Sequence, residues 1–293
     1  MSVMIDLHVH SNASDGSYSP AELAAMCAGQ GISVMALTDH DTTGGLDEGK
    51  IAAAKTGIGF IPGIELEITM PQAQSGEFHL LGLGIDKPTG AFSEAVAALS
   101  AAREERNREI LKRMEGIGIS VTYDELSAFA GGQSIGRPHF AALLVKRKIV
   151  KNIEQAFKRY LGKGRPLYLP KTGLNFDLAV TIIAESGGLS VLAHPMSLYV
   201  AWGRLPDLVK NLKERGLDGL EAWHPAAKVK ECKRLEELGK SLDLFITAGS
   251  DFHGEARQDR KLGITAGNKK IGEKLLDAIP VLAEKYKPAN YTG

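Results

Sequence analysis

Short apolar runs typical of strands alternate with helical segments along the first 86 residues, and this alternation restricts the fold more than any other feature. Helices are expected at residues 19–31 and 44–57, between the first three strands. The four expected strands are residues 3–10, 32–41, 58–69 and 78–86. The fourth strand follows the third without a helix, so we expect these two to pair. The strand–helix order favours a largely parallel sheet or barrel, and the expected fold class is α/β.

The middle of the chain has a different character. Helical patterns follow one another from about residue 91, and no convincing buried strand interrupts them. The expected helices are residues 92–118, 122–131, 137–149 and 152–164. Strand and helix patterns then alternate again. We interpret this as an α-helical cap domain inserted into a barrel, with residues 1–90 and 166–293 forming the barrel and residues 91–165 the cap.

Polar side chains gather where the expected barrel strands end. In parallel α/β folds these ends open onto one face, where side chains that perform chemistry collect. Seven of the eight histidines fall there, and the eighth, His139, lies in the insertion. His8 and His10 are one residue apart, so both point to one face of their strand and can bind one ion. The candidates are His8, His10, Asp39, His40, Glu65, His79, His194, His224, Asp251 and His253.

The residue types in this set indicate metal chemistry. Imidazoles and carboxylates without thiolates suit zinc, manganese or iron in a catalytic site, whereas structural zinc favours cysteine. One histidine at a strand end is more often structural than a ligand, but seven structural histidines are not expected together. The set exceeds what one ion needs. We therefore expect two or three divalent metal ions (Mn, Zn or Fe), with a carboxylate such as Glu65 bridging a pair.

Composition argues against several other classes of protein. Lys+Arg and Asp+Glu are equal at 35 each, so no overall field draws the chain to nucleic acid or to an anionic membrane. No secretory signal and no apolar run long enough for a membrane span is evident, so we expect a cytoplasmic protein. The sequence does not lead us to infer an obligate protein partner. Cys27 and Cys232 lie outside any Cys-x-x-Cys spacing and are expected to be buried and reduced.

Five ordered motifs give the chain a family resemblance. The segments "DLHVHSNASDGSYSP", "ALTDHDT", "GIELE", "VLAHP" and "GSDFHG" resemble the PHP (polymerase and histidinol phosphatase) family of metal-dependent phosphoesterases. The match covers about residues 4–86 and 170–265. The resemblance implies a distorted (β/α)7 barrel of PHP type and a metal-dependent phosphatase activity.

The resemblance also implies a trinuclear metal site. The first metal would take His8, His10, Glu65 and Asp251. The second would share Glu65 and add His79 and His194, and the third would take Asp15, His40 and His253. These positions show no departure from the family's pattern, so the full site is expected to be intact. Asp39 and Asp41 flank a ligand and are expected to order the loop or the ligands beside them.

The insertion refines the expected substrate. Residues 134–171 resemble the helical cap of a PHP subgroup that acts on nucleoside 3',5'-bisphosphates and on short oligonucleotide ends. Arg137, in "GRPH", is expected to grip the phosphate that is not cleaved, because a guanidinium binds phosphate through two parallel hydrogen bonds. Further candidates for substrate contacts are Ser134, His139, Arg103 and Lys171.

The expected reaction is hydrolysis of a phosphomonoester by a hydroxide that bridges two metals and attacks phosphorus in line. A third metal and a nearby Arg or Lys would neutralise the charge on the equatorial oxygens. His224 is expected to contact phosphate or to protonate the leaving oxygen, because histidine titrates in the useful pH range. A structural role for His224 is the alternative.

The leading prediction is a metal-dependent phosphatase for a small nucleotide that carries two phosphates, a nucleoside 3',5'-bisphosphate. Within the same chemistry, the alternatives are a histidinol phosphate phosphatase and a 5'-to-3' exonuclease on short oligonucleotides. An exonuclease would need only a local basic pocket. From a different class comes a non-catalytic PHP-like module in a polymerase assembly, which the intact ligand set disfavours.

Overall fold

The computed structural model describes residues 3–69, 76–131 and 134–288. The chain divides into two compact units. The barrel unit comprises Met1–Val96 and Gly173–Gly293, and the helical unit comprises Ala97–Thr172. The long helix α3 (Gly90–Gly116) begins in the barrel unit and continues in the helical unit.

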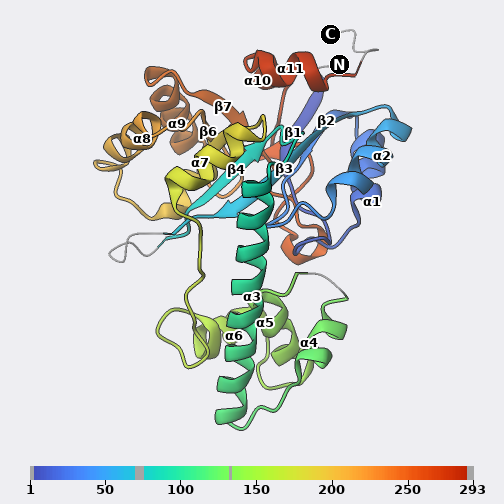
Figure 1. Cartoon of the computed structure of the whole chain (residues 1–293), viewed down its shortest axis with the longest axis vertical. Helices are drawn as coiled ribbons and strands as arrows, with labels where there is room; N and C mark the ends of the chain where they lie inside the picture. The colour runs from blue at the N-terminus through green and yellow to red at the C-terminus, as the bar shows by residue number, and fades with distance from the viewer. Residues whose placement is uncertain (1–2, 70–75, 132–133, 289–293) are drawn as a thin grey trace. The chain divides into compact units, whose positions relative to one another are not determined.

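Seven strands form one curled sheet in the order β1 to β7 (Figure 1). Strand β4 pairs antiparallel with both β3 and β5, and the other neighbours pair in parallel. The strands are β1 (Met4–Val9), β2 (Ile32–Leu37), β3 (Gly59–Glu67), β4 (His79–Leu83), β5 (Leu189–Leu192), β6 (Gly219–Trp223) and β7 (Phe245–Ala248). The predicted pairing of the third and fourth strands is confirmed.

The first and last strands approach each other just beyond their carboxyl ends. Val9 forms an isolated parallel bridge with Phe252, and the amide of Asp251 donates to the carbonyl of His8 at 2.9 Å. The observed architecture is therefore an α/β fold with a curled, mostly parallel seven-stranded sheet, consistent with a PHP-type barrel. The role of the insertion as a cap stays a prediction.

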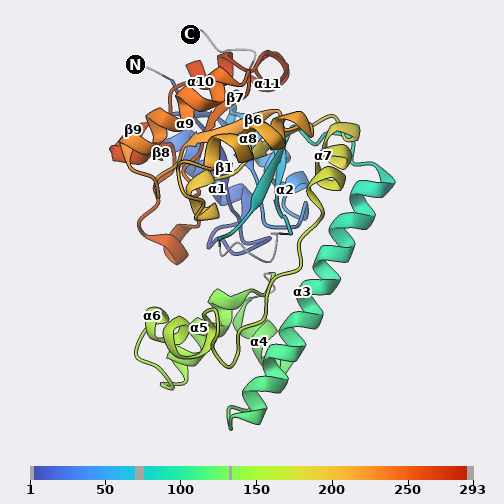
Figure 2. The same ribbon diagram turned by 90° about the vertical axis from the view of Figure 1, so that its left-hand side faces the viewer.

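Helices pack around the sheet and close one end of it. The apolar cluster draws buried residues from every strand except β6, and it also contains Leu276 and Ile279, together with Leu282. These residues belong to the segment of α10 and α11, which Figure 1 and Figure 2 both place at one end of the sheet. The helices are α1 (Pro20–Gly29), α2 (Leu46–Thr56), α7 (Phe176–Glu185), α8 (Leu205–Glu214), α9 (Val229–Ser241), α10 (Lys274–Asp277) and α11 (Pro280–Tyr286). The apolar side chains thus fill the end that holds the amino ends of the parallel strands.

A bulge in β1 separates the apolar core from the polar residues that follow. Between Asp6 and Val9, β1 has one residue more than the facing segment of β2. Such an insertion interrupts the strict alternation of side chains along a strand. Leu7 therefore joins the apolar cluster inside the sheet, whereas Val9 packs with the residues of α1 and α2 on its outer side.

The helical unit contains no strand within its described residues, as the sequence predicted. It consists of most of α3, α4 (Tyr123–Phe129), α5 (Arg137–Lys146), α6 (Ile153–Ala156) and the π-helical turn η1 (Phe157–Leu161). Its core is a separate apolar cluster that includes Leu126 and Phe140. This unit therefore has its own hydrophobic centre.

Two further predictions concern the cysteines and the membrane. Cys27 and Cys232 are both buried and unpaired, as expected. Burial raises the pKa of both thiols, so they behave as packing groups. Among the described residues, no helix is long and apolar enough to cross a membrane.

Candidate metal centre

The predicted ligands lie together at the carboxyl edge of the curled sheet. His8 is in β1, Glu65 is in β3, and most of the others lie in the loop that follows a strand. His79 begins β4, but β4 runs antiparallel to its neighbours, so its first residue lies at the same edge. The nine predicted ligands form one network of close contacts, in which His224 also takes part.

Glu65 is the centre of this network. One oxygen, Oε1, lies 2.9 Å from His79 Nδ1 and 2.8 Å from His194 Nε2. The other, Oε2, lies 3.0 Å from His40 Nδ1 and 3.3 and 3.4 Å from the Nε2 atoms of His10 and His8. A carboxylate with imidazoles against both oxygens has the arrangement expected of a ligand that bridges two ions.

His8 and His10 point toward a common position. Their Nε2 atoms are 3.0 Å apart, and Asp251 Oδ1 lies 3.5 Å from the first and 3.4 Å from the second. Ligand atoms bound to one ion at about 2.0–2.1 Å are about 3.3 Å apart in a tetrahedral site. The spacing around His8 and His10 therefore suits one ion, with Glu65 and Asp251 supplying the oxygens.

A second group lies beside the first. His10, Asp15, His40 and His253 each offer one atom within 4.8 Å of the others. His253 Nε2 is 3.3 Å from Asp15 Oδ1. His40 also belongs to a group with Glu65 and His79, although the family resemblance implied a place for it at the third metal alone. His40 thus lies between the positions expected for the second and third metals.

Groups behind the ligands hold the histidine rings in one orientation. His8 Nδ1 contacts Glu221 Oε1 at 2.9 Å, His194 Nδ1 contacts the Ser197 hydroxyl at 2.7 Å, and His253 Nδ1 contacts the carbonyl of Asp251 at 2.9 Å. Occupied Nδ1 atoms leave the Nε2 lone pairs directed at the cluster, which is the usual arrangement of histidine metal ligands.

Glu221 is a residue of the cluster that the sequence reasoning missed. It is fully buried in β6, and its second oxygen accepts a hydrogen bond from the amide of His194 at 2.7 Å. The available signal was a glutamate inside the apolar strand segment "LEAW", because an acidic side chain is rarely buried without a partner. Glu67 was also missed, and its Oε2 lies 2.9 Å from His79 Nε2.

The aspartates on either side of His40 order the loops, as predicted. Asp39 accepts hydrogen bonds from the amide and hydroxyl of Ser11 at 2.8 and 2.6 Å, and from the hydroxyl of Ser14 at 2.5 Å. Asp41 accepts from the amide of Glu67 at 2.9 Å. The Asp39 contacts fix the loops after β1 and β2 against each other, and the Asp41 contact fixes the second loop to the end of β3.

The electrostatics of the cluster fit divalent cations. Burial alone would raise the pKa of Glu65, but His40, His79 and His8 hold it well below its usual range. Burial would lower the pKa of His10, but the neighbouring carboxylates of Asp251 and Glu65 raise it to about 10. Among the described residues, Glu65 Oε2 and His10 Nδ1 are buried without a hydrogen bond. A nitrogen–oxygen set with such unsatisfied atoms suits zinc, manganese or iron.

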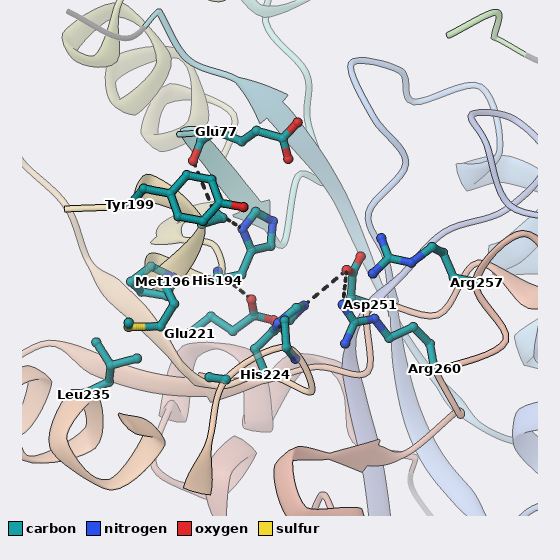
Figure 3. A pocket seen from close by; sticks show the side chains of 14 residues that line it. Glu77, His194, Met196, Tyr199, Glu221, His224, Leu235, Asp251, Arg257 and Arg260 are labelled. Atoms are coloured by element: carbon teal, nitrogen blue, oxygen red, sulfur yellow. Dashed lines mark hydrogen bonds and ion pairs between the residues drawn. The ribbon is translucent and has the colours of Figure 1, made fainter. Parts of the chain in front are cut away.

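A cavity of about 330 Å³ opens beside the cluster (Figure 3). His194, His224 and Asp251 line it together with two arginines that the sequence reasoning missed, Arg257 and Arg260. Both arginines follow the "GSDFHG" motif closely, but nothing in their local sequence distinguishes them from surface residues. In Figure 3 they lie beside Asp251, whereas Tyr199, Met196 and Leu235 lie on the opposite side.

His224 is held by both ring nitrogens. The amide of Ala226 donates to Nδ1 at 3.2 Å, so the ring proton sits on Nε2 and points at Asp251 Oδ2, 3.1 Å away. Burial lowers the pKa of His224. The side chain therefore lines the cavity and orients Asp251, and its predicted role in protonating a leaving group stays a prediction.

The predicted substrate contacts belong to the helical unit. Arg103 Nη1 donates to the hydroxyl of Ser134 at 3.3 Å, so the structure brings these two together. His139 Nδ1 accepts from the amide of Gly136 at 3.1 Å, and the Arg137 guanidinium lies 5.6 Å from the ring centre of Tyr168. Lys171 precedes the return of the chain to the barrel unit. Their contact with substrate stays a prediction.

Comparisons with known proteins agree with this geometry. The PHP domain profile matches residues 6–164. A 5'-3' exoribonuclease of Haemophilus influenzae is 36% identical over 253 residues, which cover 86% of this chain and 91% of that protein. A 3',5'-nucleoside bisphosphate phosphatase of Chromobacterium violaceum is 32% identical over 262 residues, which cover 89% and 91%. A solved Bifidobacterium adolescentis protein, proposed to be a metal-dependent phosphoesterase, superimposes with a TM-score of 0.81 at 26% identity over 94% of both chains.

Proposed function

Because the chain belongs to the PHP domain family, we propose that it is a phosphatase whose substrate is a nucleoside 3',5'-bisphosphate. The broader class, a metal-dependent phosphoesterase, follows from the family and from its relatives. The finer proposal concerns the substrate, for which the cavity beside the cluster is the main support.

The cavity suits a small molecule with a charged part and an apolar part. Arg257 and Arg260 line it near Asp251, and guanidinium groups are well matched to phosphate oxygens. Tyr199 and Met196 line the opposite side (Figure 3), where a flat apolar ring could be placed against them. A volume of about 330 Å³ is that of a small-ligand site. A nucleotide has both parts, whereas inorganic phosphate has only one.

The metal ligands proposed here are those named from the sequence. His8, His10, Glu65 and Asp251 would hold one ion, His79 and His194 a second with Glu65, and Asp15, His40 and His253 a third. Divalent cations in this site would lower the pKa of a bound water molecule toward neutral pH, and they would neutralise negative charge on the phosphate. Glu221, behind His8, would keep the ligand nitrogen directed inward by accepting the other ring proton.

Side chains of this protein would bind the phosphate groups and act near the leaving oxygen. Arg137 of the helical unit is proposed to bind the phosphate that is not cleaved, assisted by Ser134, His139, Arg103 and Lys171. His224 is proposed to act near the leaving oxygen from its place in the cavity lining.

A second candidate is a 5'-3' exonuclease acting on short RNA. It is favoured by the Haemophilus influenzae relative, whose identity of 36% exceeds the 32% of the bisphosphate phosphatase. The two reactions can cleave the same type of bond. If the 5'-phosphate is bound and the bond between O3' and phosphorus is cleaved, a bisphosphate yields inorganic phosphate and an oligonucleotide yields a 5'-mononucleotide.

A substrate panel tests the proposal. The metal-loaded protein is incubated with adenosine 3',5'-bisphosphate, histidinol phosphate and short 5'-phosphorylated oligoribonucleotides, and kcat/KM is compared. We expect the bisphosphate to give the highest value. A higher value for the oligonucleotides would select the exonuclease, and a higher value for histidinol phosphate would refute both nucleotide proposals.

A pair of variants tests the apolar side of the cavity. Tyr199 is 76% exposed with a left-handed backbone (φ 51°), an unusual conformation for an aromatic residue. Tyr199→Ala should raise KM for the bisphosphate by roughly tenfold, the value of one base-stacking contact, while Tyr199→Phe should change it little. An equal change in the inhibition constant of inorganic phosphate, which has no ring, would refute a base contact.

A further inference from the structure

One buried arginine, Arg260, lies beside the metal cluster, and its side chain makes no hydrogen bond to the residues that the structure describes. Arg260 is only 5% exposed. Among the described residues, the carboxylates that form ion pairs with it are Asp259, with Oδ2 3.5 Å from Nε, and Asp251, with Oδ2 3.9 Å from Nη2. Both distances exceed those of charge-assisted hydrogen bonds. Within residues 3–69, 76–131 and 134–288, the buried Nε has no hydrogen-bond partner.

Such a group is costly to the protein unless a partner arrives. A guanidinium has five N–H donors and stays charged in proteins, and a buried charge is normally paired and hydrogen-bonded. Asp251 does not meet this need, because its Oδ1 lies within 3.5 Å of His8 and His10 and its Oδ2 accepts from His224. Much of the hydrogen-bonding capacity of Arg260 is therefore open to a ligand.

The position of Arg260 indicates which ligand atoms it would meet. Arg260 lines the cavity with His194 and His224, and Figure 3 shows it next to Asp251. Asp251 is within reach of the atoms of His8 and His10 that point into the cluster. A phosphate that reaches the cluster through this cavity would lie against Arg260.

We propose that Arg260 binds the non-bridging oxygens of the phosphate that is hydrolysed. Charge on these oxygens persists through phosphoryl transfer, and a fixed guanidinium in a water-poor site stabilises it without reorganising. The proposal rests on the proposed function only in requiring a phosphate ester as substrate. It does not depend on the nucleotide.

The competing explanation is that Arg260 only positions Asp251 as a metal ligand. Removing the arginine would then weaken metal binding, and activity would be restored by excess metal. Direct contact with phosphate predicts unchanged metal content and weaker inhibition by inorganic phosphate. The two explanations therefore differ in readouts besides activity.

The experiment compares Arg260→Gln, Arg260→Lys and the control Arg234→Gln. Arg234 is on α9, where its guanidinium lies 3.8 Å from the Trp202 ring centre, and it is not among the residues lining the cavity. Activity is measured with p-nitrophenyl phosphate, metal content by elemental analysis, and folding by thermal unfolding. We expect Arg260→Gln to lower kcat/KM by roughly 10²–10³-fold, the effect of losing one oxyanion donor. Arg260→Lys should recover part of this loss, and the control should match the wild type.

Inorganic phosphate supplies the deciding measurement. Its inhibition constant should rise in Arg260→Gln while metal content stays at the wild-type level. An unchanged inhibition constant, or a loss of activity that excess metal reverses, would overturn the proposal. If Arg260→Gln does not fold, the same comparison is made with Arg260→Lys. If p-nitrophenyl phosphate is not hydrolysed, calorimetric binding of phosphate decides. Failure of the bisphosphate in the substrate panel would leave this result unaffected.

Discussion

The barrel unit and the helical unit fill their interiors differently. Among the described residues of the helical unit, Asn107 is the only buried polar side chain, and its amide donates to the carbonyl of Ile135 at 2.9 Å. The barrel unit buries a large set of histidines and carboxylates at one end of its apolar core. Apolar burial stabilises a unit directly, whereas buried ionisable groups are normally paired or bound to metals. The comparison suggests that only the barrel unit depends on ligands for its full stability.

The largest expected effect follows from removing the central carboxylate of the barrel unit. Glu65→Gln should lower kcat/KM by at least roughly 10³-fold, because bound metals contribute several kcal/mol to phosphate chemistry. Metal content should fall at the same time. Activity assays and elemental analysis check this, with the exposed Glu94→Gln as a matched control. Near-normal activity in Glu65→Gln would rule out the bridging role.

Removing an apolar side chain from the helical unit should act on stability and leave the metals in place. Leu126 is fully buried in that core, so Leu126→Ala should lower the free energy of unfolding by about 2–5 kcal/mol. Urea denaturation measures the change, and elemental analysis should give wild-type metal content. Leu178→Ala, at a position 47% exposed in the barrel unit, should cost less than about 0.5 kcal/mol. Loss of metal from Leu126→Ala would contradict the independence of the two interiors.

Metal removal should weaken the barrel unit selectively. A ligand at 100 times its Kd stabilises the folded state by about 2.7 kcal/mol. Chelation should therefore speed amide hydrogen exchange in β1 and β3, while exchange in α4 and α5 stays the same. Equal acceleration in both units would show that their stabilities are coupled.

Metal binding should also release protons. The pKa of His10 is raised to about 10 without metal, so His10 carries a proton at neutral pH that a metal must displace. The apparent metal affinity should therefore rise as pH rises toward 10, by about tenfold per pH unit for each proton displaced. Titration calorimetry in buffers of different ionisation enthalpy measures the released protons. A heat that does not depend on the buffer would contradict this.

The smallest effect is expected on the surface of the helical unit. Arg147 Nη2 contacts both oxygens of Glu125, at 2.5 and 2.7 Å, but both side chains are partly exposed. Glu125→Gln should change the free energy of unfolding by about 0–1 kcal/mol, and less at high salt. Thermal unfolding at two salt concentrations checks this prediction. A salt-independent loss of several kcal/mol would mean that the pair behaves as a buried one.

Much of the fold and part of the site could be predicted from local pattern. The residue types at the strand ends predicted a metal cluster, and the structure gathers those side chains at one edge. The residue-by-residue assignment to three metals came from the family resemblance. His40 shows the limit of this assignment, because it belongs to two groups of potential ligands, one with Asp15 and one with Glu65.

Other residues of the site could not be predicted, because their meaning depends on distant contacts. In the sequence, Glu221 is a single glutamate in an apolar segment. Its role depends on its contact with His8, which is 213 residues away in the chain. The local sequence does not distinguish Arg260 from a surface arginine, and only the structure shows that it is buried beside Asp251. The bulge in β1 is equally invisible in the sequence, since it exists only relative to β2.

The sequence by itself determined the alternation of elements and the chemical character of the strand ends, because both depend on residue type and short-range spacing. Tertiary structure alone decided which donors share a position, which carboxylate orients which ring, and which arginine is buried beside the cluster. Those properties arise from distances between side chains on different strands, and pairing and twist of the sheet set such distances.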